Sequence, residues 1–318
     1  MANEIELKLA LAPQGMQIVK QSWLPRQAVE SQARQQLGNI YFDTPELALN
    51  QHKVALRLRE HNGQYIQTLK TKGQSVGGLH QRGEWEWEVA EPRLYPELLV
   101  GTAFPQEIQV GELTPLFRTD FERTVVLMRR GESLIELALD EGWVIAGERK
   151  APILEVELEL RQGNLAELFN LAQELAQEVP VWLSDVSKAE RGYRLGGVVK
   201  SVADDALVLL PAGQWGRKLY RNWLRRMEGF RAQPTSTTAM QLIEAVATFQ
   251  AAVAGLADWQ WDGAERGQLA QQLAEELQEL RGLVEKLPKS SQEALGQFEG
   301  SRRAGQIALA FSRWFAVA

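Results

Sequence analysis

Residues 4–9 read EIELKL, so charged and aliphatic side chains alternate along this segment. Successive side chains of a β-strand point to opposite faces, which places Glu4, Glu6 and Lys8 on one face and the aliphatic residues on the other. One such segment alone is most simply an antiparallel strand with a solvated face. The pattern predicts a strand, and its meaning depends on whether it recurs.

The same alternation recurs further along the chain with charges of both signs. Residues 56–59 (LRLR) and 68–72 (TLKTK) carry cations, whereas residues 84–88 (EWEWE) and 154–160 (LEVELEL) carry carboxylates. Each charged face is backed by an apolar one. This arrangement indicates a sheet that closes around a charged interior, with its apolar faces turned outward against loops and helices.

The composition, with 45% hydrophobic and 24% charged residues over 318 positions, is that of an ordinary globular protein. A net charge of −6 argues against a surface that binds nucleic acid over the whole molecule, but it allows a local basic pocket. The absence of cysteine excludes disulfides, thiolate metal sites and a cysteine nucleophile. Without a secretory signal or a run of about 18 apolar residues, we expect a cytoplasmic protein with no membrane or nucleic-acid partner.

The character of the sequence changes near residue 200. Short alternating runs separated by turn signals fill residues 1–200, apart from two helical stretches at 13–24 and 165–178. Leu, Ala, Gln and Glu dominate afterwards, and we expect helices near 215–230, 237–257, 264–287 and 290–316. The predicted fold class is α+β, with a strand-rich domain over 1–200 followed by an all-α helical bundle over 201–318.

A barrel interior with charges of both signs calls for a charged ligand, because buried charges cost several kcal/mol each unless they are paired. The candidate cations are Lys8, Arg57, Arg59, Lys70, Lys72, Arg82, Arg123 and Lys188. The candidate carboxylates are Glu4, Glu6, Glu84, Asp140, Glu155, Glu157 and Glu159. A polyphosphate chelated to Mg²⁺ or Mn²⁺ fits both sets, since arginines hold phosphate oxygens and carboxylates hold hard cations. The alternative is a set of salt bridges between the strands.

The motifs resemble those of the CYTH superfamily, the triphosphate tunnel enzymes. Residues 4–8 match the family's ExExK signature. Further motifs follow in the family's order: 56–59 (LRLR), 68–70 (TLK), 81–84 (QRGE), 119–123 (TDFER), 136–140 (ELALD), 155–159 (EVELE) and 187–193 (SKAERGY). The resemblance covers about residues 1–200 and is closest to the bacterial inorganic triphosphatases, in which a CHAD-like helical region follows the CYTH domain. Here that region is shortened.

The resemblance implies an antiparallel eight-stranded β-barrel tunnel with flanking helices, in which a divalent metal, Mg²⁺ or Mn²⁺, assists hydrolysis of tripolyphosphate to pyrophosphate and phosphate. The implied metal ligands are Glu4, Glu6, Asp140, Glu155, Glu157 and Glu159. The implied substrate ligands are Lys8, Arg57, Arg59, Lys70, Arg82, Arg123, Lys188 and Arg191. We expect Lys70 or Lys72 to activate the attacking water and Glu84 to orient the cations.

Alternatives stay open at this point. Another CYTH activity, namely thiamine triphosphatase, nucleoside triphosphatase or adenylate cyclase, would use the same tunnel, and a non-catalytic polyphosphate-binding protein would have lost turnover. In the helical region, Arg217, Arg221 and Arg225 share one helix face. This face predicts either a site for longer polyphosphate or a surface that packs on the first domain. Both a monomer and a homodimer are compatible with the sequence.

Overall fold

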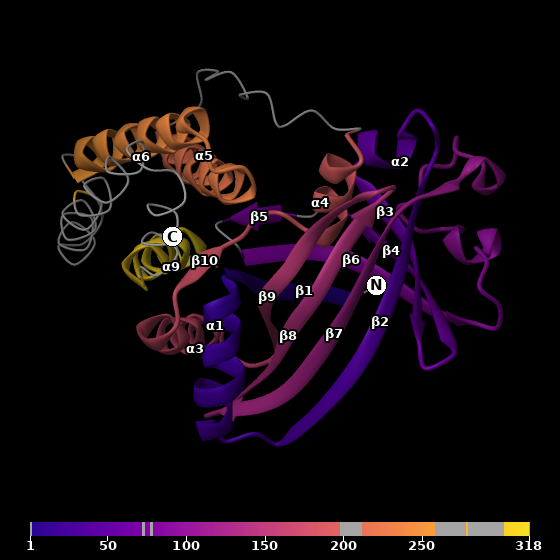
Figure 1. Ribbon diagram of the computed structural model, residues 1–318, viewed down its shortest axis with the longest axis horizontal. Helices are drawn as coiled ribbons and strands as arrows, with labels where there is room; N and C mark the ends of the chain where they lie inside the picture. Colours follow the sequence, from indigo (N-terminus) through magenta and orange to yellow (C-terminus); the bar gives the residue numbers. More distant parts are fainter. Residues whose placement is uncertain are drawn as a thin grey trace.

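The computed structural model describes residues 2–71, 74–76, 79–197, 212–257, 278 and 302–317. Its strands are β1 (Ala2–Leu11), β2 (Ser31–Asp43), β3 (Val54–His61), β4 (Gln64–Thr71), β5 (Gln74–Val76), β6 (Leu79–Val89), β7 (Thr114–Arg130), β8 (Ser133–Ala146), β9 (Arg149–Gln162) and β10 (Val181–Leu183). Its α-helices are α1 (Pro13–Ile18), α2 (Ala48–Gln51), α3 (Leu165–Glu178), α4 (Lys188–Leu195), α5 (Ala212–Ala232), α6 (Ser236–Ala257) and α9 (Arg302–Val317). Figure 1 shows their arrangement.

Strand β1 closes the sheet. It pairs with β9 along one side, and along the other side with β6 over residues 2–7 and with β10 over residues 9–11. In the described part of the chain, the resulting ring runs β1-β9-β8-β7-β2-β3-β4-β6 through eight antiparallel strands. The predicted antiparallel eight-stranded β-barrel is therefore confirmed.

The outward faces of the barrel strands are apolar, as the alternation predicts. Leu7 and Leu9 of β1 are fully buried and belong to one hydrophobic cluster with Leu175 of α3, Trp223 of α5 and Phe311 of α9. The cluster forms because α3 and α9 lie side by side against β9 and β10 (Figure 1). The apolar outer face of β1 thus packs on helices instead of meeting solvent.

The C-terminal helices agree with the expected helical stretches where the structure describes them. Helix α5 matches the stretch expected near 215–230, and α6 matches that near 237–257. Helix α9 covers the end of the last expected stretch. The stretch expected at 264–287 and the expected domain boundary near residue 200 lie outside the described residues, apart from Gln278. None of the described helices is long and apolar enough to cross a membrane.

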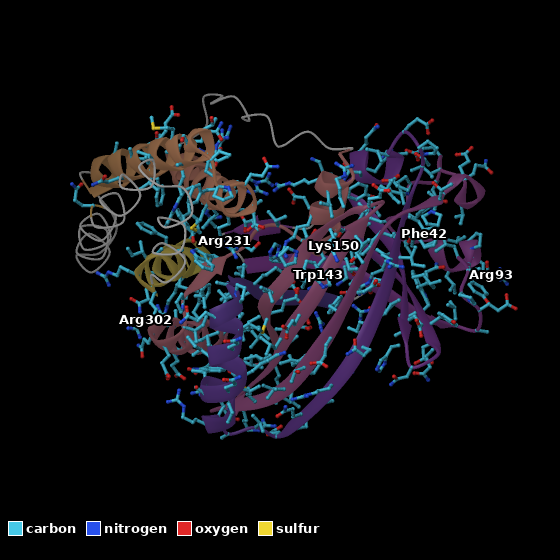
Figure 2. All side chains as sticks on the ribbon, in the orientation of Figure 1. Phe42, Arg93, Trp143, Lys150, Arg231 and Arg302 are labelled. Carbon is cyan, nitrogen blue, oxygen red and sulfur yellow. The ribbon has the colours of Figure 1, made fainter. Side chains whose placement is uncertain are left out.

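Elsewhere on the barrel surface, side chains pack on one another without helices. Lys150 of β9 lies 5.0 Å from the centre of the Trp143 ring of β8, and both residues are labelled on the outer face of the sheet in Figure 2. Trp85 and Trp87 of β6 face outward as well, against a second hydrophobic cluster that includes Leu99 and Phe104. The tryptophans of the EWEWE segment therefore do not line the interior.

Helix α4 packs against β7, β8 and β9 (Figure 1). The helix begins after Ser187, whose side chain accepts a hydrogen bond from the backbone N–H of Glu190. Gly192 packs so closely on Phe117 that a β-carbon there would overlap the aromatic ring. The hydroxyl of Tyr193 donates a 2.7 Å hydrogen bond to Asp43 at the end of β2. These contacts fix α4, and with it Lys188 and Arg191, against the barrel.

Candidate active site

The charged side chains of β1, β8 and β9 form rows across the barrel wall. Glu6 of β1 pairs in register with Glu159 of β9, which pairs with Glu136 of β8. In the next row, Glu157 lies between Lys8 and Ala138, and in the row after that, Glu155 pairs with Asp140. The strand register thus places carboxylates from three strands beside one another.

Three of these carboxylates converge closely. Oxygen atoms of Asp140, Glu155 and Glu157 lie within 4.8 Å of one another, and all three residues are buried. The Lys188 ammonium lies 2.6 Å from Asp140 and 3.1 Å from Glu157, and it contacts Glu155 as well. This acidic triad could bind a metal, since carboxylate oxygens are the ligands that hard divalent cations prefer.

Cations surround the triad. Arg123 donates two parallel 2.7 Å hydrogen bonds to Asp140 and one of 2.5 Å to Glu157. Lys8 lies 3.1 Å from Glu157. Burial alone would raise the pKa of the Glu157 carboxyl, but Lys188, Lys8 and Arg123 hold it well below its usual range. The triad is therefore neutralised by the protein's own side chains.

A second acidic group, one strand pair further along the wall, is less completely neutralised. It consists of Glu4, Glu6, Glu136 and Glu159, and the printed ion pairs of Glu136 and Glu159 are with Arg161, at 2.7 and 2.6 Å. Burial, together with repulsion from Glu4, Glu136 and Glu6, raises the pKa of Glu159 to about 7, although Arg161 opposes the shift. A divalent cation at this group would relieve the repulsion.

The cations of β3 and β4 occupy another part of the interior. Arg57 is buried and lies 3.6 Å from Glu84 and 3.4 Å from Glu86. Arg59 donates a 3.0 Å hydrogen bond to Asn39. Burial and the neighbouring guanidiniums of Arg57 and Arg123 lower the pKa of Arg59 to about 9. The positive charge of Arg59 is thus poorly compensated within the protein, and an anion would stabilise it.

Lys70 lies between two carboxylates, 2.8 Å from Glu84 and 3.5 Å from Glu4. Glu84 therefore contacts both Lys70 and Arg57. Lys72 lies outside the described residues. Arg82 pairs in register with Glu4 on β6, but its side chain is likewise outside the described part of the structure.

The structure brings most of the predicted site residues to the barrel interior or its α4 end. Arg191 of α4 lies 2.5 Å from Glu155 and thereby joins the acidic triad. Two further residues were missed by the sequence analysis. Glu136 shares the strand face of Asp140 and could have been found by the same alternation. Tyr41 is buried beside Arg57, which together with other cations lowers the pKa of its hydroxyl against the opposing effect of burial.

The arginines of α5 contact other parts of the chain. Arg217 donates a 3.0 Å hydrogen bond to the carbonyl of Phe315 in α9. Arg221 lies 3.9 Å from Asp185, and Arg225 lies 3.8 Å from Glu190 of α4. These contacts agree with a packing surface, and a site for longer polyphosphate remains a prediction.

Comparisons with known proteins agree with this geometry. The family model of the CYTH domain matches residues 2–193. The inorganic triphosphatase of Haemophilus influenzae is 39% identical over 198 residues, which make up 62% of this chain but only 56% of that protein. The match thus spans little more than half of this relative's length.

Two solved structures are similar at lower identity. One is a candidate adenylyl cyclase from Hippeastrum with a dominant triphosphatase activity, 21% identical with a TM-score of 0.45 over 60% of this chain and 95% of that one. The other, from Pyrococcus horikoshii, is 21% identical with a TM-score of 0.38 over 59% of this chain and 97% of that one. The family match ends before α5, so the CHAD-like resemblance of the helices stays a prediction. Because the family model covers more than half of the sequence, the chain belongs to the CYTH domain family.

Proposed function

We propose that this protein hydrolyses inorganic tripolyphosphate to pyrophosphate and phosphate in the barrel interior, with the help of a divalent metal. The observation that carries the proposal is the presence of two poorly compensated charges of opposite sign. Glu159 has its pKa raised to about 7, and Arg59 has its pKa lowered to about 9. A phosphate chain with a bound divalent cation would compensate both charges.

The metal fits the acidic group around Glu159 better than it fits the triad. The triad carboxylates already contact Lys188, Arg123 and Lys8, so a cation there would have to displace these side chains. We therefore assign Glu4, Glu6 and Glu159 as the principal ligands of Mg²⁺ or Mn²⁺, with Asp140, Glu155 and Glu157 on its substrate side. When bound, the metal would supply charge neutralisation at the phosphate oxygens.

The cations of the interior would bind the phosphate chain. Arg57, Arg59 and Arg123 offer planar guanidiniums that can hold two phosphate oxygens at once. Lys8 and Lys188 would add point charges next to the acidic triad. Phosphoryl transfer to water depends mainly on positioning and charge stabilisation, which such a constellation provides without a covalent step.

Lys70 is the side chain that we propose positions the attacking water, with Lys72 as its alternative. Glu84 contacts Lys70 at 2.8 Å and Arg57 at 3.6 Å, so it would hold both groups in place for the substrate. The printed name of the Haemophilus influenzae relative, inorganic triphosphatase, supports this choice of substrate.

The test is phosphate release from tripolyphosphate, ATP and thiamine triphosphate in parallel, with Mg²⁺, with Mn²⁺ and with EDTA. The wild type is compared with Glu4→Gln/Glu6→Gln. The matched control is Glu132→Gln/Glu148→Gln, which removes two exposed carboxylates in the β7–β8 and β8–β9 turns. We expect metal-dependent release from tripolyphosphate in the wild type and the control, and none in the variant.

A preference for ATP or thiamine triphosphate would instead assign another activity of the family. Tight binding of tripolyphosphate without any release would identify a binding protein.

A further inference from the structure

Helix α5 reaches the candidate active site through one carboxylate. The side chain of Glu228 is only 15% exposed and lies 3.7 Å from the Nε atom of Arg191 in α4. Its other oxygen lies 3.5 Å from the hydroxyl of Ser184. Arg191 Nε is buried and makes no hydrogen bond to a described residue, so the Glu228 carboxylate is the negative charge facing it.

The opposite end of the same guanidinium faces the barrel interior. Arg191 donates a 2.5 Å hydrogen bond to Glu155, a fully buried member of the acidic triad. Arg191 therefore bridges two carboxylates, one in the helical region and one in the barrel. Burial alone would lower the pKa of Arg191, but Glu155 and Glu228 raise it above its ordinary value.

Glu228 is held in place by its own neighbours. Arg231, one turn further along α5, lies 3.9 Å from Glu228 and donates a 3.2 Å hydrogen bond to the carbonyl of Leu11 in β1. Its guanidinium also stacks over the Trp182 ring of β10, 4.2 Å from the ring centre. Figure 2 labels Arg231 where the helices meet the barrel. The position of Glu228 is thus fixed by contacts with the barrel wall.

We propose that Glu228 is a positioning residue, which fixes the guanidinium of Arg191 and through it the carboxylate of Glu155. The helical region would then be a working part of the active site and not only an appended domain. This inference rests on the proposed function, because it assigns Glu155 a place in the site. A buried arginine that loses one of its two carboxylates is free to reorient, and Glu155 would lose its fixed orientation with it.

A double-mutant cycle tests the proposal, with Glu228→Gln, Arg191→Met and their combination assayed for kcat and KM with tripolyphosphate. The matched control is Glu190→Gln. Glu190 contacts Arg225 of α5 at 3.8 Å and Arg194 at 2.6 Å, so it joins the same two helices, but it makes no printed contact with Glu155.

We expect Glu228→Gln to lower kcat about tenfold with little change in KM, the lower end of the effect of removing a supporting ligand partner. It should cost no further activity in the Arg191→Met background. Glu190→Gln should lower the melting temperature about as much as Glu228→Gln while leaving kcat unchanged. Independent, multiplying effects of Glu228→Gln and Arg191→Met, or equal losses of kcat in Glu228→Gln and Glu190→Gln, would overturn the proposal.

A second readout does not need turnover. Mn²⁺ affinity, measured by electron paramagnetic resonance, should fall about tenfold in Glu228→Gln and stay at the wild-type value in Glu190→Gln. If the wild type binds Mn²⁺ but hydrolyses no tripolyphosphate, the proposed function fails while the Mn²⁺ affinities still decide the role of Glu228. Unchanged Mn²⁺ affinity in Glu228→Gln would contradict that role.

Discussion

Arg123 of β7 and Asp140 of β8 lie directly opposite each other, and two parallel hydrogen bonds of 2.7 Å join the guanidinium to the carboxylate. The carboxylate is fully buried, and the guanidinium also contacts Glu157 at 2.5 Å. One arginine therefore compensates two of the three triad carboxylates. This relationship makes Arg123 important for stability as well as for substrate binding.

The variant Arg123→Met should lower the free energy of unfolding by about 3–5 kcal/mol, because it leaves buried carboxylates without their partner. Urea unfolding followed by circular dichroism measures this loss. Arg123→Lys retains the charge without the two-pronged geometry, so we expect a smaller loss of stability and a clear loss of tripolyphosphate affinity. Wild-type stability in Arg123→Met would mean that the triad does not depend on this side chain.

Glu159 predicts a specific pH dependence. Its pKa is about 7 in the folded protein against 4.5 for the ordinary carboxyl, so between these pH values the folded state binds a proton that the unfolded state does not. The contribution of Glu159 to stability therefore falls as pH rises from 4.5 toward 7 and is fully unfavourable above 7.

Glu159→Gln should consequently raise the melting temperature of the metal-free protein at pH 8, measured by scanning calorimetry in EDTA, and should reduce the stabilisation that Mg²⁺ or Mn²⁺ produces. Glu112→Gln, at an exposed position, is the control and should change neither quantity. An unchanged melting temperature of Glu159→Gln in EDTA would show that Glu159 is not under repulsion.

Gly192 predicts how closely α4 must approach the barrel. A β-carbon at this position would overlap the Phe117 ring, so Gly192→Ala should push the helix away and lower the free energy of unfolding by about 1–3 kcal/mol. Phosphate release should fall as well, because Lys188 and Arg191 move with the helix. Adding Phe117→Leu provides room for the extra methyl group, and the double variant should regain part of the activity. Full activity in Gly192→Ala alone would contradict this close fit.

Lys70 predicts a loss of catalysis without a loss of fold. Lys70→Met should reduce turnover of tripolyphosphate by about 10²- to 10⁴-fold, the usual effect of removing a group that assists proton transfer. Circular dichroism and the melting temperature should stay close to those of the wild type. Lys150→Met, on the outer face of β9, serves as the control. Near-normal turnover in Lys70→Met would remove this lysine from the mechanism.

Local alternation was sufficient to predict which face of each strand carries charge. The segments around Glu4, Arg57 and Glu155 have the predicted strands, and their aliphatic residues lie on the opposite face. The strand neighbours were not predictable in this way, because the partners of β1 come from distant parts of the chain. Resemblance to a family, and not periodicity, supplied the count of eight strands.

Individual contacts were harder to predict than faces. Glu136 shares the strand face of Asp140, yet its pairing with Glu159 depends on the register between β8 and β9. The contact between Glu228 and Arg191 joins two helices whose packing angle no local pattern encodes. The roles of the site residues and the domain boundary near residue 200 stay predictions.

The closure of the barrel by β1 also has a consequence for folding during synthesis. Lys8 of β1 pairs with Glu157 of β9, and Leu11 pairs with Val181 of β10. At roughly 5–20 residues per second, β1 waits on the order of 10 s on the ribosome before these partners exist. During this time one edge of β1 can pair with β6, while its other edge and its aliphatic face remain open to other chains. Chaperone dependence during expression should therefore be set by this first strand.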